Sequence, residues 1–176
     1  MTTPDQASLL NQLTSGDDQR AEAAALALAE LGVKILPSLQ SLLQSPDPEA
    51  RWWATRVLAE LDSPQVAPLL ITSLQDGDIT VRQCAALALS FHPHETAVTY
   101  LIAVLNDVDR LLAHLAADAL VANGAAAVPA LLEVMQTGLQ VAHLEAVRAL
   151  ALIGDNSGWV GSMGGNGLNA SAGSIY

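Results

Sequence analysis

Apolar residues along this chain follow the spacing of amphipathic helices, and the pattern returns about every 30 residues. Two of the clearest copies read DPEARWWATRVLAEL and DITVRQCAALALSF. Related segments begin at Asp17, Asp47, Asp78, Asp109 and Leu139, which are 30, 31, 31 and 30 residues apart. Such an internal period is typical of repeat proteins, in which each unit is one supersecondary element.

Two positions within these segments hold the same residue in all five copies. An alanine follows each start by seven positions, as Ala24, Ala54, Ala85, Ala116 and Ala146. A leucine follows each start by eleven positions, as Leu28, Leu58, Leu89, Leu120 and Leu150. Both positions fall on one face of a helix, so the alanines predict a seam where neighbouring helices approach closely.

A second, shorter helix is expected before each of these segments. Leucine stands eight positions before each start, as Leu9, Leu39, Leu70, Leu101 and Leu131. Proline stands ten positions before three of the starts, as Pro37, Pro68 and Pro129, while Thr99 breaks the series. Because proline is tolerated in the first turn of a helix, the spacing predicts a helix of about ten residues, a turn and a helix of about fifteen.

Turn and capping residues agree with this division. An aspartate opens most of the longer helices, where its carboxylate can accept free backbone N–H groups. The glycines in the turns before these caps are Gly16, Gly77 and Gly138. The glycines expected to close the longer helices are Gly32, Gly124 and Gly154.

These features predict an all-α protein built by stacking. A helix pair of about 30 residues cannot bury its own apolar face, whereas stacked pairs bury a continuous one. We therefore expect a right-handed α-solenoid of five pairs over residues 1–155 and an irregular glycine-rich tail over residues 156–176. The expected units lie near 5–32, 33–62, 63–93, 94–124 and 125–155.

The pattern D-x-x-[VA]-R-x-x-A-A-x-A-L, seen in DPEARWWATRVL and DITVRQCAALAL, resembles the short HEAT repeat of the phycobilisome-lyase type. The resemblance covers roughly residues 5–155. In that family, recurring aspartate and arginine side chains form a ladder between successive repeats. The matching residues here are Asp47 with Arg51 and Asp78 with Arg82. Other residues replace the arginine in the remaining units, so the two central repeats are expected to be the most regular.

The resemblance also implies which surface binds a partner. In HEAT-like solenoids the second helix of each pair lines the concave side. Its positions farthest from the buried stripe carry Trp and Leu here, where a fully solvated face would carry Lys and Glu. Trp53, one position nearer the core, is expected to fill space beside the alanines. The residues expected to bind a partner are Trp52, Arg56, Gln83, Leu87, His114, Asp118, Leu144 and Arg148.

Composition narrows the classes of partner. The chain carries 7 Lys+Arg against 18 Asp+Glu, a net charge of −11, so it would repel a polyanion such as nucleic acid. The N-terminus shows no signal peptide, and apolar runs stop before the roughly 18 residues of a membrane span. The lone Cys84 rules out an internal disulfide. We therefore expect a cytoplasmic protein that binds neither nucleic acid nor membrane.

Candidate chemistry is sparse. The segment FHPHE at 91–95 carries two His and a Glu, but it occupies an ordinary inter-repeat turn, so no metal site is expected. The deoxyhypusine hydroxylases, a HEAT-like enzyme group, use several His-Glu pairs, and this chain has one adjacent pair, His94-Glu95. Cys84 is expected to be a half-buried apolar residue. No catalytic residue, cofactor or metal is therefore expected.

The function that follows is that of a non-catalytic scaffold, or an assembly or accessory factor, that binds another protein or peptide on its concave helix face. The family resemblance keeps one enzymatic alternative open, a lyase-like subunit that handles bilin on phycobiliproteins. A bilin would need Arg or Lys near its propionates. On the predicted groove the candidates are Arg56 and Arg148.

The tail after Asp155 has six Gly, four Ser, three Asn and no charge. Three interpretations of it remain open. The first is a flexible or foreign extension, and the second is a leader followed by a small uncharged peptide that is cleaved near Gly164-Gly165. The third is a segment that folds back over the last repeat, which needs a cover, through Trp159, Val160, Met163 and Leu168.

Overall fold

The computed structural model describes residues 5–137 and 140–156, and within these ranges all regular elements are helical. The α-helices are α1 (Gln6–Leu13), α2 (Asp18–Ala29), α3 (Leu36–Leu42), α4 (Pro48–Ala59), α5 (Val66–Ser73), α6 (Ile79–Phe91), α7 (Glu95–Val104), α8 (Arg110–Asn123), α9 (Val128–Thr137) and α10 (Gln140–Asn156). Two short 3-10 helices, η1 (Gly32–Ile35) and η2 (Gly124–Ala127), lead into α3 and α9.

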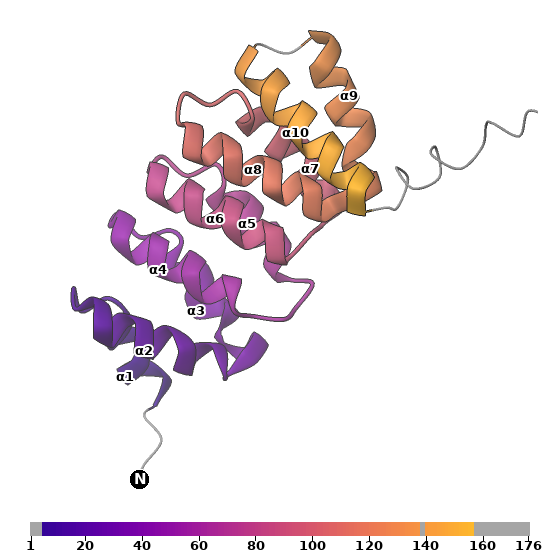
Figure 1. The fold of residues 1–176 in the computed structure, drawn as a ribbon. Helices are drawn as coiled ribbons and strands as arrows, with labels where there is room; N and C mark the ends of the chain where they lie inside the picture. The colour runs from indigo at the N-terminus through magenta and orange to yellow at the C-terminus, as the bar shows by residue number, and fades with distance from the viewer. Residues whose placement is uncertain (1–4, 138–139, 157–176) are drawn as a thin grey trace, which may run out of the picture.

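The helices stack as five pairs, from α1 and α2 at one end to α9 and α10 at the other (Figure 1). The even-numbered helices form one layer and the odd-numbered helices form the second. Each even-numbered helix packs on the next, in the order α2, α4, α6, α8 and α10. This arrangement confirms the predicted right-handed α-solenoid. The outer surface of these five helices is called the even-helix face below.

The repeated alanines and leucines form the interior of the stack. Each of the five predicted alanines is at most 1% exposed. Four of the five predicted leucines are 0% exposed, whereas Leu150 in the last pair is only partly buried. Because a methyl side chain keeps two helices close, the leucines of one pair reach the next pair and are covered by it. Trp53 is buried in the same core, as expected.

Aspartate caps open the second helix of the first four pairs. The carboxylates that accept a backbone N–H of the first turn belong to Asp17, Asp47, Asp78 and Asp109. Hydrogen bonds from the side chain and backbone of Thr80 lower the pKa of Asp78, and the Leu112 N–H has the main effect on the lowered pKa of Asp109. These bonds confirm the predicted caps and satisfy donors that the helix leaves free.

The glycines that were predicted to end α8 and α10 differ in their positions in the structure. Gly124 ends α8 with a φ of +57°, in the left-handed region that favours glycine. Gly154 lies inside α10, which continues to Asn156, so the prediction that Gly154 closes this helix was wrong. Glycine permits a helix to end but does not force it, since one glycine in a helix costs only about 1 kcal/mol. Gly138 lies outside the described residues.

Within the described residues, the stretch Arg110–Thr137 has the length and apolar composition of a membrane span, as judged by those two properties alone. It consists of α8 and α9, separated by η2 and the left-handed Gly124. Neither helix by itself reaches the roughly 20 residues that a span needs. The expectation that no segment crosses a membrane stays a prediction.

Enlarging a seam alanine should destabilise the stack. Ala85 in α6 is 0% exposed, so we expect Ala85→Leu to lower the free energy of unfolding by about 1–3 kcal/mol through overpacking. Ala23→Leu on the exposed side of α2 is the matched control and should change it by less than about 0.5 kcal/mol. Urea unfolding followed by circular dichroism measures both variants. An equal loss of unfolding free energy in the two variants would contradict the close approach of neighbouring helices at Ala85.

Candidate functional site

Two networks of charged side chains cross the joints between repeats, and the first lies beside the loops that precede the even-numbered helices. Arg51 of α4 donates to both carboxylate oxygens of Asp76, from Nε at 2.7 Å and from Nη2 at 2.8 Å. Its Nη1 donates to the backbone oxygens of Ser45 and Pro46. The two paired side chains are largely buried, so this fork of hydrogen bonds holds the second repeat on the third.

Arg82 of α6 repeats this arrangement one repeat later. Its guanidinium lies 3.7 Å from the carboxylate of Asp107 and donates to the backbone oxygens of Asp76 and Gly77. The second pair is looser than the first, since its N–O distance is 3.7 Å against 2.7 Å for Arg51 and Asp76. Arg82 Nε is buried without a hydrogen-bond partner in the described part of the chain. These two arginine–aspartate pairs, Arg51 with Asp76 and Arg82 with Asp107, are called the inter-repeat ladder below.

The acids of the inter-repeat ladder differ from those expected. The sequence pattern assigned the ladder between successive repeats to Asp47, Arg51, Asp78 and Arg82. The carboxylates that contact the two arginines belong to Asp76 and Asp107, whereas those of Asp47 and Asp78 accept backbone N–H groups as helix caps. The ladder acids stand two residues before a capping aspartate, in the sequences DGD and DVD. That spacing was the signal that sequence reasoning missed.

The first pair of the ladder, Arg51 with Asp76, changes the pKa of both of its members. The pKa of Asp76 is lowered, first by the hydrogen bonds that Arg51 donates to its carboxylate and further by the backbone N–H of Asp78. The same hydrogen bonds raise the pKa of Arg51. Both groups are therefore held in their charged forms, in which the pair is strongest.

The second network lies on the even-helix face and contains most of the residues predicted to bind a partner. Arg56 of α4 donates to Glu22 of α2 at 2.7 Å and to Glu60 at the end of its own helix. Arg148 of α10 donates to Asp118 of α8 at 2.8 Å. Each of these arginines therefore joins its repeat to the preceding one.

Gln83 and His114 extend the second network. Gln83 of α6 donates to Asp109, the cap of α8, at 3.0 Å. The ring of His114 lies 3.5 Å from Glu145 of α10, and its backbone oxygen accepts from Arg148 at 3.2 Å. Five of the eight predicted binding residues thus bridge neighbouring repeats. The polar groups of these five residues bind other groups of the same protein. The apolar residues among the eight therefore remain available for contact with a partner.

The three remaining predicted residues are Trp52, Leu87 and Leu144. Leu87 is 47% exposed and Leu144 is 66% exposed. Trp52 is half-buried, and its ring stands edge-on to that of the buried Trp53 at a centroid distance of 4.8 Å. It lies in a hollow between α4 and Asp78, the cap of α6. Trp52 therefore supports the packing of α4 as well as offering part of its ring to solvent.

One pocket brings predicted residues together with residues that sequence reasoning missed. It has a volume of about 510 Å³ and lies between α4 and α6 on the even-helix face. Its lining residues are Arg56, Ala59, Glu60, Cys84, Leu87, Ala88, Phe91 and His92. Phe91 is 69% exposed, and it stands one helical turn after Leu87, a spacing that places both on one face. We call this site the α4–α6 pocket.

The α4–α6 pocket holds no activated nucleophile. Burial raises the pKa of the Cys84 thiol to about 11, so the thiol stays protonated at neutral pH. A ring nitrogen of His92 lies 2.8 Å from the backbone oxygen of Ala59, and His94 caps α7. In the part of the chain that the structure describes, no group of three or more His, Cys, Asp or Glu could hold a metal ion.

Comparison with known proteins identifies the family. A family model described as HEAT repeats matches residues 6–90 and 36–121, which together span more than half of the chain. The chain therefore belongs to the HEAT-repeat family. A comparison with curated protein sequences gives no match.

Solved structures share the fold at low identity. The complex of CpcE and CpcF of phycocyanin lyase from Nostoc sp. PCC7120 matches with a TM-score of 0.64 and 20% identity, over 83% of this chain and 99% of that chain. An engineered protein matches with a TM-score of 0.53 and 25% identity, over 84% and 78% of the two chains. Human deoxyhypusine hydroxylase in complex with glycerol matches with a TM-score of 0.51 and 18% identity, over 85% of this chain and 73% of that chain. These likenesses support the solenoid fold.

Removing one member of the inter-repeat ladder should destabilise the protein. We expect Arg51→Gln to lower the free energy of unfolding by about 2 kcal/mol at neutral pH, because the largely buried Asp76 carboxylate loses two charge-assisted hydrogen bonds. Arg20→Gln is the matched control, since Arg20 pairs with Asp17 on an exposed surface. It should cost less than about 1 kcal/mol. Chemical denaturation measures both, and a control as costly as Arg51→Gln would contradict the role of the ladder.

The contribution of this pair should depend on pH. The pKa of Asp76 is lowered in the folded protein, so its stabilising effect is complete above the unfolded carboxyl pKa of about 4. It is lost as pH falls through the lowered folded pKa. We therefore expect the stability difference between the wild type and Asp76→Asn to stay constant from about pH 7 to about pH 5 and to shrink as pH falls below about 4. Denaturation curves across this range test the expectation, and a constant difference would count against it.

Proposed function

We propose that this protein is a non-catalytic scaffold that binds a polypeptide partner on its even-helix face, with the α4–α6 pocket at the centre. The observation that carries the proposal is the position of the exposed Leu87 and Phe91 on this pocket, beside Arg56. Aromatic and arginine side chains at a hollow are the types most often found as binding hot spots. The chemistry of the pocket also fits binding, because its thiol is protonated.

Further apolar side chains extend the surface across the neighbouring helices. Leu26 on α2 is 49% exposed, and on α10 Leu144 and Val147 are 66% and 43% exposed. A partner segment that crosses the even-numbered helices would therefore meet apolar groups before and after the pocket. Exposed apolar groups that recur over several elements are typical of interaction surfaces.

The charges of the even-helix face favour a partner with basic groups. The acids of the second network outnumber its two arginines, Arg56 and Arg148. These acids are Glu22, Glu60, Asp109, Asp118 and Glu145. An acidic surface attracts and orients a basic partner. The network also fixes the repeats relative to one another, so little ordering of this surface is needed on binding. The proposed partner is a segment with apolar anchors and basic flanks.

The proposed role is that of a cytoplasmic assembly or accessory factor that uses the concave side of the solenoid. The similarity to a chain from a complex of CpcE and CpcF supports a role that depends on a second protein. The HEAT-repeat family supports a binding scaffold, since stacked helix pairs form extended surfaces for partners.

Site-specific crosslinking tests the binding surface. Replacement of Phe91 by the photoreactive p-benzoylphenylalanine should yield a discrete covalent adduct in extract of the source organism, because the ring lies exposed at the pocket. The same group at Thr99, on the exposed side of α7, is the matched control and should yield no such adduct. Mass spectrometry of the adduct identifies the partner, and adducts of equal yield at both positions would refute the proposed face.

A charge placed at the pocket should weaken binding of the crosslinked partner. Leu87→Asp should reduce affinity at least about tenfold, since it puts a carboxylate at the centre of the apolar contact. Val33→Asp, at a residue of η1 that is 52% exposed, is the matched control and should leave affinity unchanged. Trp52→Ala should weaken binding less than Leu87→Asp, because Trp52 is half-buried. Unchanged affinity of Leu87→Asp would exclude the α4–α6 pocket.

A bilin-handling lyase subunit is the second candidate, and the likeness to phycocyanin lyase favours it. The two arginines expected to meet bilin propionates are both engaged. Arg56 donates to Glu22 and Glu60, and Arg148 donates to Asp118 and Glu145. A propionate would have to displace these carboxylates, which weighs against this function.

Absorption spectroscopy separates the two candidates. For a protein-binding scaffold we expect no change in the visible spectrum of free biliverdin when the protein is added. A lyase-like subunit would shift and sharpen the long-wavelength band, and Arg56→Gln would reduce that shift. Such a shift, with that dependence on Arg56, would replace the scaffold proposal by the bilin-handling one.

A further inference from the structure

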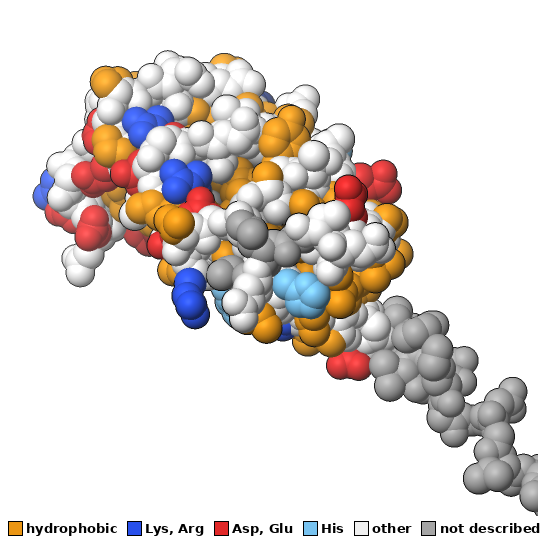
Figure 2. Space-filling view, turned by 90° about the horizontal axis from the view of Figure 1, so that it is seen from above, with side chains coloured by type: hydrophobic (Ala, Val, Ile, Leu, Met, Phe, Trp, Pro, Cys, Tyr) orange, Lys and Arg blue, Asp and Glu red, His pale blue; other side chains and the backbone are white. Residues whose placement is uncertain are grey.

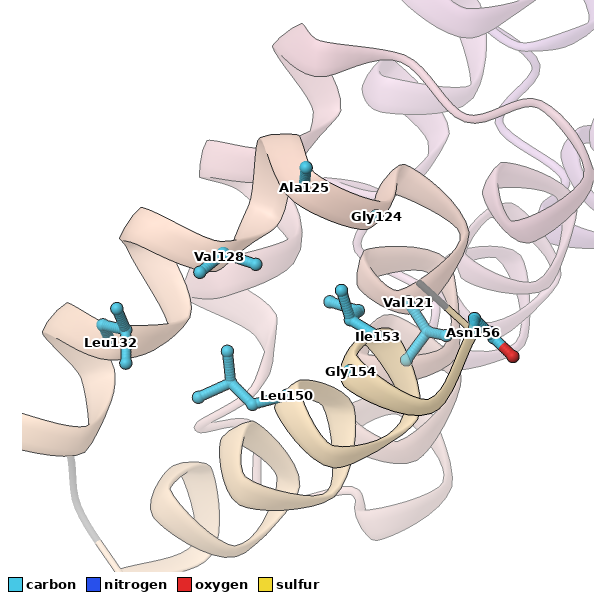
Figure 3. Close-up of a pocket in the computed structure, with 9 residues that line it drawn as sticks. All are labelled: Val121, Gly124, Ala125, Val128, Leu132, Leu150, Ile153, Gly154 and Asn156. Carbon is cyan, nitrogen blue, oxygen red and sulfur yellow. The ribbon is translucent and has the colours of Figure 1, made fainter. Parts of the chain in front are cut away.

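The end of the solenoid formed by the last helix pair carries an apolar pocket of about 700 Å³ (Figure 3). Val128 and Leu132 of α9 lie across this space from Leu150 and Ile153 of α10. The remaining lining residues come from the end of α8, from η2 and from α10, and they are Val121, Gly124, Ala125, Gly154 and Asn156. Apart from the side-chain amide of Asn156, every lining side chain is apolar.

The pocket lies where each earlier repeat is covered by the next one. The leucines equivalent to Leu150 in the first four units, Leu28, Leu58, Leu89 and Leu120, are 0% exposed. Leu150 is partly exposed, and Leu132 is 48% exposed whereas its equivalent Ile71 is 8% exposed. Seen from this end, hydrophobic side chains reach the surface between charged groups (Figure 2). The described residues therefore leave apolar side chains uncovered that the repeat pattern buries elsewhere.

We propose that the segment directly after α10 covers this pocket, with the indole of Trp159 as the group that enters it. Residues 157–176 lie outside the described residues, as does the Gly164-Gly165 point of the peptide-precursor interpretation. Asn156 ends α10 and lies on the pocket, and Trp159 follows it by three residues. Three residues span at most about 10 Å, so the indole is tethered within reach of the pocket.

The chemistry of the segment matches that of the pocket. It carries no charged side chain, so covering the pocket desolvates no ionised side chain of the segment. An indole buries roughly 150–250 Å² of surface, the largest amount that one side chain can remove from water here. Gly158 and Gly161 flank the tryptophan and its neighbour Val160, and without Cβ atoms they allow the backbone to approach α9 and α10 closely.

Methyl NMR of the full chain tests this proposal. The ring current of a bound indole shifts methyl resonances that it covers, so Trp159→Ala should move the signals of Ile153 and Leu132 and leave Ile35, at the other end of the stack, unchanged. Tyr176→Ala, which removes the other aromatic residue of the segment, is the matched control and should leave Ile153 in place. A chain that ends at Asn156 should show the same Ile153 shift as Trp159→Ala and a lower midpoint of thermal unfolding.

Three outcomes would overturn the proposal. An Ile153 resonance that is identical in the wild type, Trp159→Ala and the shortened chain shows that the segment does not enter the pocket. A shift caused by Tyr176→Ala but not by Trp159→Ala shows a different anchor. An Ile153 resonance that depends on protein concentration but not on Trp159 shows that a second copy of the chain covers this end. The proposal is independent of the α4–α6 pocket, so its failure leaves the proposed function untouched.

Discussion

Each helix pair of this protein depends on its neighbours to cover its apolar side, and this dependence organises the whole molecule. An alanine at one fixed position lets the even-numbered helices approach, and a leucine one turn later is buried against the next pair. Interior repeats are therefore sealed on both sides. The last repeat has Leu150 only partly buried, and an apolar pocket of about 700 Å³ lies there. The same rule thus explains both the core and its exposed end.

Four arginines add a second, electrostatic layer to this packing. Arg51 and Arg82 bind acids of the following repeat, whereas Arg56 and Arg148 bind acids of the preceding one. Exposed apolar side chains, among them Leu26, Leu87 and Leu144, lie on the same even-numbered helices. A surface whose charges fix the repeats and whose apolar side chains face outward suits a protein that presents a preformed shape to a partner.

The helix pairs could be predicted because the information lies in short stretches of chain. Ala85 and Leu89 stand one turn apart on one helix, and Asp78 caps the same helix, so local spacing is enough. The ladder acid Asp76 was missed because the ladder was assigned to the capping aspartates, and Asp76 stands two residues before one of them. Phe91 was missed because its segment, FHPHE, was considered for metal binding and not for its spacing to Leu87.

By itself, then, the sequence determined the number of helix pairs, the seam between them and the residues that cap them, since each depends on positions along a single helix. The tertiary structure decided which charged groups meet across a joint and which side chains stay exposed. Both depend on the offset between consecutive pairs, a distance that no local pattern records. For this reason Gln83, Asp118 and Arg148 proved to hold repeats together, while Leu87 was left open beside a pocket.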